Sequence, residues 1–157
     1  MWPPRCCGTF RCCRSERGSA AHAALTLLLD TNVALLLDTN VVLWWMAGDT
    51  GRISTAAVQA IGAENARIVV SAVSVWEVAI KRRLGRLDAP DDLLPQLERA
   101  RVELLPISAR HADRVATLPP HHHDPFDRLL VAQAASEALA LVTADESLRR
   151  YDVDVVW

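Results

Sequence analysis

Residues 27–42 read LLLDTNVALLLDTNVV, and this stretch decides the fold because it contains an apolar strand that ends at an acid. An eight-residue unit occurs in it twice, with seven of eight positions identical. The unit is far too short for a solenoid repeat, so we interpret it as a local duplication of one strand end. Residues 35–37, followed by Asp38 and a helix over 40–47 that stops at Gly48, form a strand-to-helix unit.

The two copies compete for the same strand position. Both place an aspartate, Asp30 or Asp38, after three leucines and before Thr-Asn. A helix that began after Asp30 would carry Asp38 into its apolar interior, where an unpaired carboxylate is strongly unfavourable. We therefore expect the second copy to form the strand and Asp38 to be the catalytic aspartate. Exchange between the two registers stays open, since an even shift keeps each side chain on its original face.

Predicted strands and helices alternate along the rest of the chain. Ser54 is expected to cap one helix, and Asp124 with Pro125 opens the longest one. The predicted helices are 40–47, 54–63, 74–83, 91–100, 108–118, 125–138 and 146–151, and the predicted strands are 35–37, 68–70, 102–107, 139–142 and 153–156. Strands separated by helices indicate a parallel sheet covered on both faces. The fold class is therefore α/β, a three-layer α/β/α sandwich with a parallel central sheet.

Four acids fall where the carboxyl ends of such strands place an active site. Asp38 and Asp145 follow predicted strands, and Glu77 and Asp127 lie in the first turns of predicted helices. Four carboxylates in one place would repel one another, and a hard divalent cation such as Mg²⁺ resolves that conflict. Such an ion can activate a water for attack on a phosphodiester.

Each acid also has a structural interpretation. Ser74 and Glu77 have the spacing of a capping box. Asp127 and Asp145 could complement the dipoles of their helices. Asp124 is interpreted as an N-cap, not a ligand. Spacing alone leaves these alternatives open.

Five sequence segments indicate the function more specifically than the spacing of the four acids does. They read LLLDTNVVLWW, SAVSVWEVAIKRRLGRL, LPPHHHDPFDRLLVAQA, LVTADESL and DVDVVW. In this order they resemble the VapC-type PIN-domain toxins, over residues 35–157. The doubled LLLDTNV segment departs from the family pattern, as does His123, where relatives often carry a basic residue.

The resemblance implies a Mg²⁺-dependent endoribonuclease, with Mn²⁺ as a substitute, that hydrolyses RNA through a metal-activated water. It implies that the catalytic, metal-binding acids are Asp38, Glu77, Asp127 and Asp145. Thr39, Asn40 and Thr143 match polar positions that support the carboxylates. A cognate antitoxin and a homodimer are also implied. The alternatives are a magnesium-dependent phosphatase, although Asn40 stands where its DxD pattern needs a second acid, and a catalytically inactive PIN-fold binding module.

Composition divides the chain into two parts. All four cysteines lie before residue 14, and residues 1–25 have a net charge of +3, so residues 26–157 have about −5. We expect 1–25 to be a disordered extension and 26–157 to be the PIN domain. The cysteine spacing does not fit a zinc module. No apolar run is long enough to span a membrane, so we expect a cytoplasmic protein. An acidic domain needs metal ions and local basic groups to hold RNA.

Three other motifs have both a structural and a functional interpretation. We interpret His121, His122 and His123 as a solvated or RNA-facing loop, because consecutive side chains point in different directions. The basic helix end with Lys81, Arg82, Arg83 and Arg86 is either a solvated face or a phosphate contact. Of the adjacent Trp44 and Trp45, we expect one to be buried and the other to face a partner.

Overall fold

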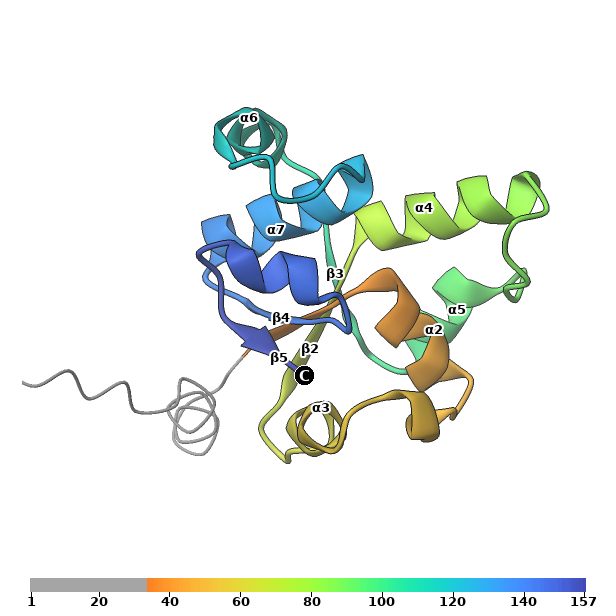
Figure 1. Ribbon diagram of the computed structural model, residues 1–157. Coiled ribbons are helices and arrows are strands. Elements are labelled where there is room, and N and C mark those ends of the chain that lie inside the picture. Colours follow the sequence, from red (N-terminus) through yellow and green to blue (C-terminus); the bar gives the residue numbers. More distant parts are fainter. Residues whose placement is uncertain (1–33) are drawn as a thin grey trace, which may run out of the picture.

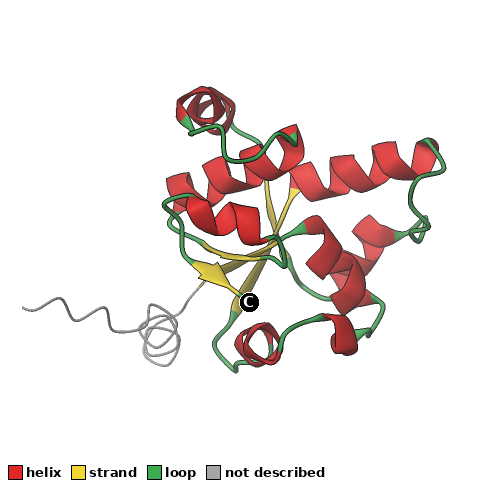
Figure 2. Cartoon of the chain, viewed as in Figure 1, coloured by secondary structure: helices red, strands yellow, loops and turns green. Residues whose placement is uncertain are grey.

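The computed structural model describes residues 34–157, and its centre is a sheet of five parallel strands (Figures 1 and 2). The strands are β1 (Ala34–Leu37), β2 (Arg67–Ser71), β3 (Glu103–Leu105), β4 (Ala140–Val142) and β5 (Val155–Val156). They lie in the order β3-β2-β1-β4-β5. In the central strand β1, Leu36 is in register with Val69 of β2 on one side and with Leu141 of β4 on the other.

Within residues 34–157, six α-helices connect and cover the strands, together with two short 3-10 helices. They are α2 (Thr39–Met46), η1 (Thr50–Arg52), α3 (Thr55–Ile61), α4 (Ala72–Arg83), α5 (Leu93–Arg99), α6 (Ala109–Thr117), α7 (Pro125–Glu137) and η2 (Glu146–Arg150). Two predicted starts are confirmed. Ser54 caps α3 by accepting the Ala57 amide, and Asp124 caps α7 by accepting the Phe126 amide.

The sheet is buried on both faces. Leu35 and Leu37 belong to one core cluster, to which α2, α3 and α5 also contribute, and Leu36 belongs to a second cluster with residues of α7 and η2. Figure 1 shows these helices on opposite sides of the strands. Full burial of one leucine side chain contributes roughly 1.5–3 kcal/mol, so an apolar run in β1 stabilises both layers at once. The predicted three-layer α/β/α sandwich with a parallel central sheet is confirmed.

Helix α4 begins earlier than the sequence predicts. The residue that caps it is Ser71, whose hydroxyl accepts the Val73 amide at 2.9 Å. The same hydroxyl donates to Gln133 Oε1 of α7 at 2.5 Å, in the buried interior. Glu77 consequently lies in the second turn of α4, not the first, and the capping box that starts at Ser74 is wrong.

The edges of the sheet also differ from the prediction. The strand expected over 102–107 is limited to Glu103–Leu105, and the strand expected over 153–156 to Val155–Val156. Pro106 follows β3 directly and has no amide hydrogen for a ladder bond. The helix expected over 146–151 is a 3-10 helix.

Neither of the adjacent tryptophans is fully buried. Both pack partly against the cluster around Leu35. The ring of Trp44 lies 6.3 Å from that of Trp157 and has the Arg52 guanidinium 4.6 Å from its centre. The predicted division of the pair between core and partner surface is therefore wrong.

Strand β1 is formed by the second copy of the duplicated unit. The first copy up to Val33, and residues 1–25 with their cysteines, lie outside the described residues. Between Ala34 and Trp157, no helix has the length and apolar character needed to cross a membrane.

Candidate active site

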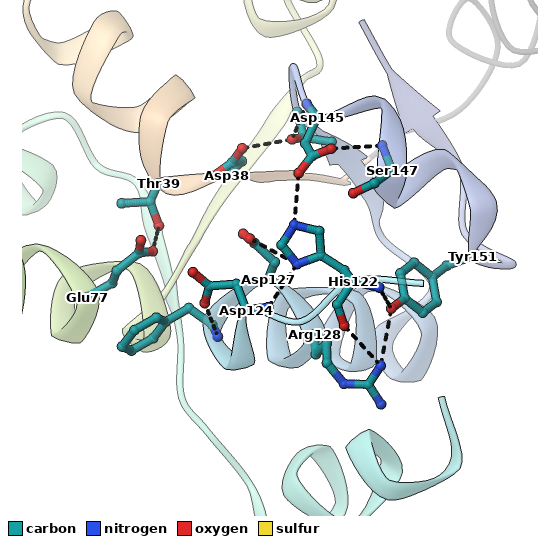
Figure 3. A network of polar contacts seen from close by, with 12 residues as sticks. Asp38, Thr39, Glu77, His122, Asp124, Asp127, Arg128, Asp145, Ser147 and Tyr151 are labelled. Carbon is teal, nitrogen blue, oxygen red and sulfur yellow. Dashed lines mark hydrogen bonds and ion pairs between the residues drawn. The ribbon is translucent and has the colours of Figure 1, made fainter. Parts of the chain in front are cut away.

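The four predicted acids lie around the carboxyl ends of the two central strands (Figure 3). Asp38 follows β1 directly, and Asp145 lies in the turn after β4. Glu77 and Asp127 come from α4 and α7, two helices that contact each other. The structure therefore brings together residues that are 107 positions apart at the extremes.

Asp38 is almost enclosed, with 5% of its surface exposed. Its carboxylate accepts a hydrogen bond from Thr143 Oγ1 at 2.7 Å and one from the Asn40 amide at 3.3 Å, and it caps α2. Burial raises the pKa of Asp38 above its usual value, the negative charge of Glu77 adds to that, and the hydrogen bonds only partly oppose it. A buried carboxylate of this kind favours either a proton or a nearby cation.

Glu77 is equally buried, and both of its oxygens have partners. Thr39 Oγ1 donates to Oε2 at 2.6 Å, and Lys81, one turn further along α4, forms an ion pair with Oε1. The hydrogen bond to Glu77 raises the pKa of Lys81, so this ammonium group stays charged at neutral pH. Lys81 thereby supplies one positive charge at the edge of the acidic cluster.

Asp127 has a strongly raised pKa. Burial raises the pKa of Asp127 to about 7, the charges of Asp38 and Asp124 add to the shift, and His122 opposes it. Since Asp38 and Glu77 both act on Asp127 through their charges, these three acids behave as one electrostatic cluster.

Asp145 lies at the more open side of the cluster, with 39% of its side chain exposed. It caps η2, and its Oδ1 accepts the Ser147 amide at 2.8 Å. Partial burial would raise the pKa of Asp145, but hydrogen bonds from Ser147 and the neighbouring His122 outweigh it and lower the pKa. Asp145 is therefore the acid best suited to remain ionised without a cation.

His122 is a site residue that the sequence interpretation missed. Its Nδ1 lies 3.4 Å from Asp127 Oδ2 and its Nε2 lies 3.1 Å from Asp145 Oδ2. These three residues each offer a ligand atom within 4.8 Å of the others, a spacing that could hold a metal ion. Of the two interpretations of this loop, solvated or RNA-facing, the solvated one is wrong for His122, whereas His121 and His123 are exposed. RNA contact by the loop stays a prediction. The position of His122 two residues before the cap of α7, and so near Asp127, was the available signal.

The other predicted contacts are found in part. Thr39 and Thr143 support Glu77 and Asp38 as expected. The side chain of Asn40 is exposed, and only its backbone amide reaches Asp38. At the basic end of α4, Arg82 pairs with Asp91 at 3.3 Å, while Arg83 and Arg86 are exposed.

The chemistry of these residues fits a divalent cation. Among the described residues, the ligand atoms that lie within 4.8 Å of one another are two carboxylates and one imidazole, those of Asp127, Asp145 and His122. Asp38 and Glu77 are not members of that group. Burial raises the pKa values of Asp38 and Asp127, and the charges of neighbouring acids add to both shifts. A bound cation would offset the unfavourable ionisation of these buried, neighbouring carboxylates, and acidic clusters in proteins usually hold Mg²⁺ in this way.

Comparison with known proteins agrees with this geometry. The PIN domain family model matches residues 35–154, and the chain belongs to this family. It is 35% identical over 130 residues to Ribonuclease VapC22 of Mycobacterium tuberculosis, covering 80% of this chain and 92% of that protein.

Two solved structures share the fold. VapBC2 from Rickettsia felis, bound to a DNA fragment from its promoter, aligns with a TM-score of 0.59 at 16% identity, over 78% of this chain and 97% of that one. DNA-bound VapBC from Salmonella typhimurium aligns with a TM-score of 0.57 at 17% identity, over 78% and 96%.

Proposed function

We propose that this protein is a metal-dependent endoribonuclease that acts as the toxin of a toxin–antitoxin pair. Membership of the PIN domain family and 35% identity to Ribonuclease VapC22 support a hydrolase that acts on RNA. The observation that carries the proposal is the convergence of four acids at the carboxyl ends of β1 and β4, with raised pKa values at two of them. An acidic cluster of this kind needs a cation, and a phosphodiester substrate needs one too.

Asp38, Glu77, Asp127 and Asp145 are the proposed ligands and catalytic residues, and Mg²⁺ is the proposed ion, with Mn²⁺ as a substitute. Oxygen ligands suit both ions. When bound, the ion would polarise the phosphodiester and activate a water for in-line attack. Hydrolysis forms one phosphorus–oxygen bond to that water and breaks the one to the leaving ribose oxygen, which takes up a proton.

The chain itself contributes positioning. Thr143 holds Asp38, and Thr39 and Lys81 hold Glu77, so these carboxylates have fixed orientations before substrate arrives. The Lys81 ammonium group lies beside the cluster and offsets part of the phosphate charge. An acidic domain has few other means of retaining RNA near its site.

A cognate antitoxin, a homodimer and action in the cytoplasm complete the proposal. Proteins of the same fold from Rickettsia felis and Salmonella typhimurium are found in VapBC assemblies, which supports an antitoxin partner. Growth arrest on expression should be relieved by co-expressing the neighbouring open reading frame. Light scattering on the purified protein would test the dimer.

Two other functions are less well supported. A magnesium-dependent phosphatase of the DxD kind needs an acid where Asn40 stands, and the Asn40 side chain is exposed. A catalytically inactive binding module would be favoured by loss of one of the four acids, and all four are present.

The test is a cleavage assay with purified protein and a mixture of cellular RNAs. Cleavage should require Mg²⁺ or Mn²⁺, stop when EDTA is added and return with excess Mg²⁺. Asp127→Asn should be inactive while keeping the wild-type circular dichroism spectrum. Cleavage that survives chelation, or an active Asp127→Asn protein, would contradict the metal mechanism.

A further inference from the structure

His122 lies among the four acids, and their proposed binding of a metal does not explain its role. Its side chain is 20% exposed and lies between Asp127 and Asp145 (Figure 3). Nδ1 accepts the backbone amide of Asp124 at 3.1 Å, and Nε2 lies 3.1 Å from Asp145 Oδ2. Nδ1 therefore lies close to a donor, the Asp124 amide, and at 3.4 Å also to the carboxylate of Asp127, whereas Nε2 faces the Asp145 carboxylate.

These partners assign the hydrogen of the neutral ring. A ring nitrogen that accepts a backbone amide carries no hydrogen, so the hydrogen of the imidazole is on Nε2. Nε2–H then donates to Asp145 Oδ2. Because the Ser147 amide donates to Asp145 Oδ1, each oxygen of Asp145 has one fixed hydrogen bond and one free lone pair.

The backbone of His122 is itself held in place. Its amide donates to Tyr151 Oη at 2.9 Å, and Tyr151 is buried. Arg128 of α7 donates to Tyr151 Oη at 3.2 Å and to the Pro119 carbonyl at 2.8 Å. The loop that carries the imidazole is thus fixed between α7 and the residue that follows η2.

Asp145 is the acid that most needs such support. Asp38 and Glu77 are buried and accept hydrogen bonds from buried threonine hydroxyls, whereas Asp145 has the largest exposed fraction of the three. It also lies in a turn and not in a regular element. Without a second donor, rotation of its carboxylate would be limited by the Ser147 amide alone.

We propose that His122 is a positioning residue that orients Asp145 toward the metal through Nε2–H, and is not itself a ligand. This inference rests on the proposed function, since it assumes that Asp145 binds the ion. Outer partners of this kind fix ligand orientation, and their loss weakens metal affinity about 10–100-fold. The imidazole acts as a rigid spacer between the start of α7 and the turn after β4.

Two substitutions test the roles of the two ring nitrogens of His122 separately. In His122→Asn the amide oxygen can take the place of Nδ1 and accept the Asp124 amide, but the side chain is too short to reach Asp145. In His122→Gln the amide nitrogen can take the place of Nε2 and donate to Asp145. His123→Asn is the matched control, because His123 is the next residue and is exposed.

The experiment measures Mn²⁺ binding to the full chain by isothermal titration calorimetry, together with single-turnover RNA cleavage and melting temperature. His122→Asn should weaken Mn²⁺ binding about 10–100-fold, and His122→Gln and His123→Asn should bind nearly as the wild type does. Cleavage should follow metal affinity. If His122→Asn does not fold, the near-wild-type binding of His122→Gln still tests the proposal.

Three results would overturn the inference. Wild-type affinity in a folded His122→Asn protein would show that Asp145 needs no imidazole. Loss in His122→Gln as large as in His122→Asn would indicate that the ring nitrogen is a ligand. Absence of Mn²⁺ binding in the wild type would contradict the proposed function as well, which distinguishes the two failures.

Discussion

Thr143 connects two acids of the candidate site through one buried hydroxyl. Its Oγ1 donates to Asp38 Oδ2 at 2.7 Å and accepts the Asp145 amide at 3.1 Å. Thr143→Val keeps the shape of the side chain and removes both bonds. We expect the change to weaken Mg²⁺ binding and RNA cleavage about 10–100-fold, because Asp38 loses its strongest orienting partner. Calorimetry and single-turnover kinetics would measure it.

Thr143→Ser is the control for that change, because serine keeps the hydroxyl and loses only a methyl group. It should bind Mg²⁺ nearly as the wild type does. A folded Thr143→Val protein with wild-type affinity would show that burial alone orients Asp38.

Asp127 makes the stability of the metal-free protein depend on pH. Burial and the charges of Asp38 and Asp124 raise its pKa from 3.8 to about 7. Because the folded-state pKa is the higher one, this acid stabilises the fold at low pH, and the contribution is lost as pH rises from 3.8 through about 7. Asp127→Asn removes the titration.

In EDTA, therefore, Asp127→Asn should melt above the wild type at pH 8, and the difference should shrink toward pH 4. A gain on the order of 1 kcal/mol corresponds to about 4 °C for a domain of this size. Saturating Mg²⁺ should reverse the order, because the ion favours the ionised acid and asparagine binds it poorly. Differential scanning calorimetry across pH measures both effects. If the melting temperatures of the two proteins change with pH in parallel, the raised pKa of Asp127 is refuted.

At this scale the sequence predicted the four acids and the two threonines, but not His122. Asp38 and Asp145 follow strands and Asp127 lies in the first turn of α7, so local patterns place these three at one edge of a sheet. Glu77 lies one turn further into its helix than the sequence indicates. The direction of His122 depends on Tyr151, 29 residues away, and on Arg128. The sequence places His122 close to the cap of α7, but it does not show that the side chain of His122, and not that of His121 or His123, faces the site.

Helix α7 ends in a strained conformation at Ala138, where φ is 52° and ψ is 46°. An alanine in the left-handed region crowds its Cβ against the backbone, whereas glycine adopts it freely. We expect Ala138→Gly to raise the free energy of unfolding by about 0.5–1 kcal/mol, after allowing for the greater freedom of glycine in the unfolded chain. Urea denaturation would measure it.

An alanine-to-glycine substitution at an ordinary helical position should change the free energy of unfolding in the opposite direction. Ala112 is exposed in the middle of α6, and Ala112→Gly should lower the free energy of unfolding by about 1 kcal/mol. Destabilisation by both changes would show that the left-handed backbone at Ala138 carries no cost.

Among the elements, two helix starts were predictable from their capping residues. Ser54 and Asp124 both cap as expected, Ser54 although Thr55 directly follows it. Before α4, Ser71 and Ser74 both fit the pattern. The choice between them depends on a buried hydrogen bond from Ser71 to Gln133, 62 residues away, so local sequence did not decide it.

For the whole molecule, the central strands were easier to predict than the edges. β1 and β4 are covered on both faces, so they appear in the sequence as uninterrupted apolar runs. The edge strand β3 exposes Glu103 and ends directly before Pro106. Its sequence therefore lacks the continuous pattern that marks a buried parallel strand.

Residues 1–25 should contribute little to the activity of the domain. We propose that residues 26–157 are the PIN domain, since the family match covers residues 35–154. Deleting 1–25 should leave the melting temperature and RNA cleavage nearly unchanged. A large loss of stability, or stoichiometric zinc in the intact protein, would show that the cysteine-rich segment is structural.

The arrangement of the whole sheet supports our proposal that the second copy of the duplicated unit supplies the catalytic aspartate. β1 is the central strand, and Asp38 at its end contacts Thr143 from the turn after β4, 105 residues away. Shifting the register by eight residues would carry Asp38 into the interior of the following helix and leave it without that partner. Asp38→Asn should abolish Mg²⁺-dependent cleavage and leave the fold intact, because burial already raises the pKa of Asp38 and an uncharged amide suits the site. Asp30→Asn should behave as the wild type, as judged by cleavage and circular dichroism. The reverse pattern would assign the strand to the first copy, and equal partial losses would indicate that the two registers exchange.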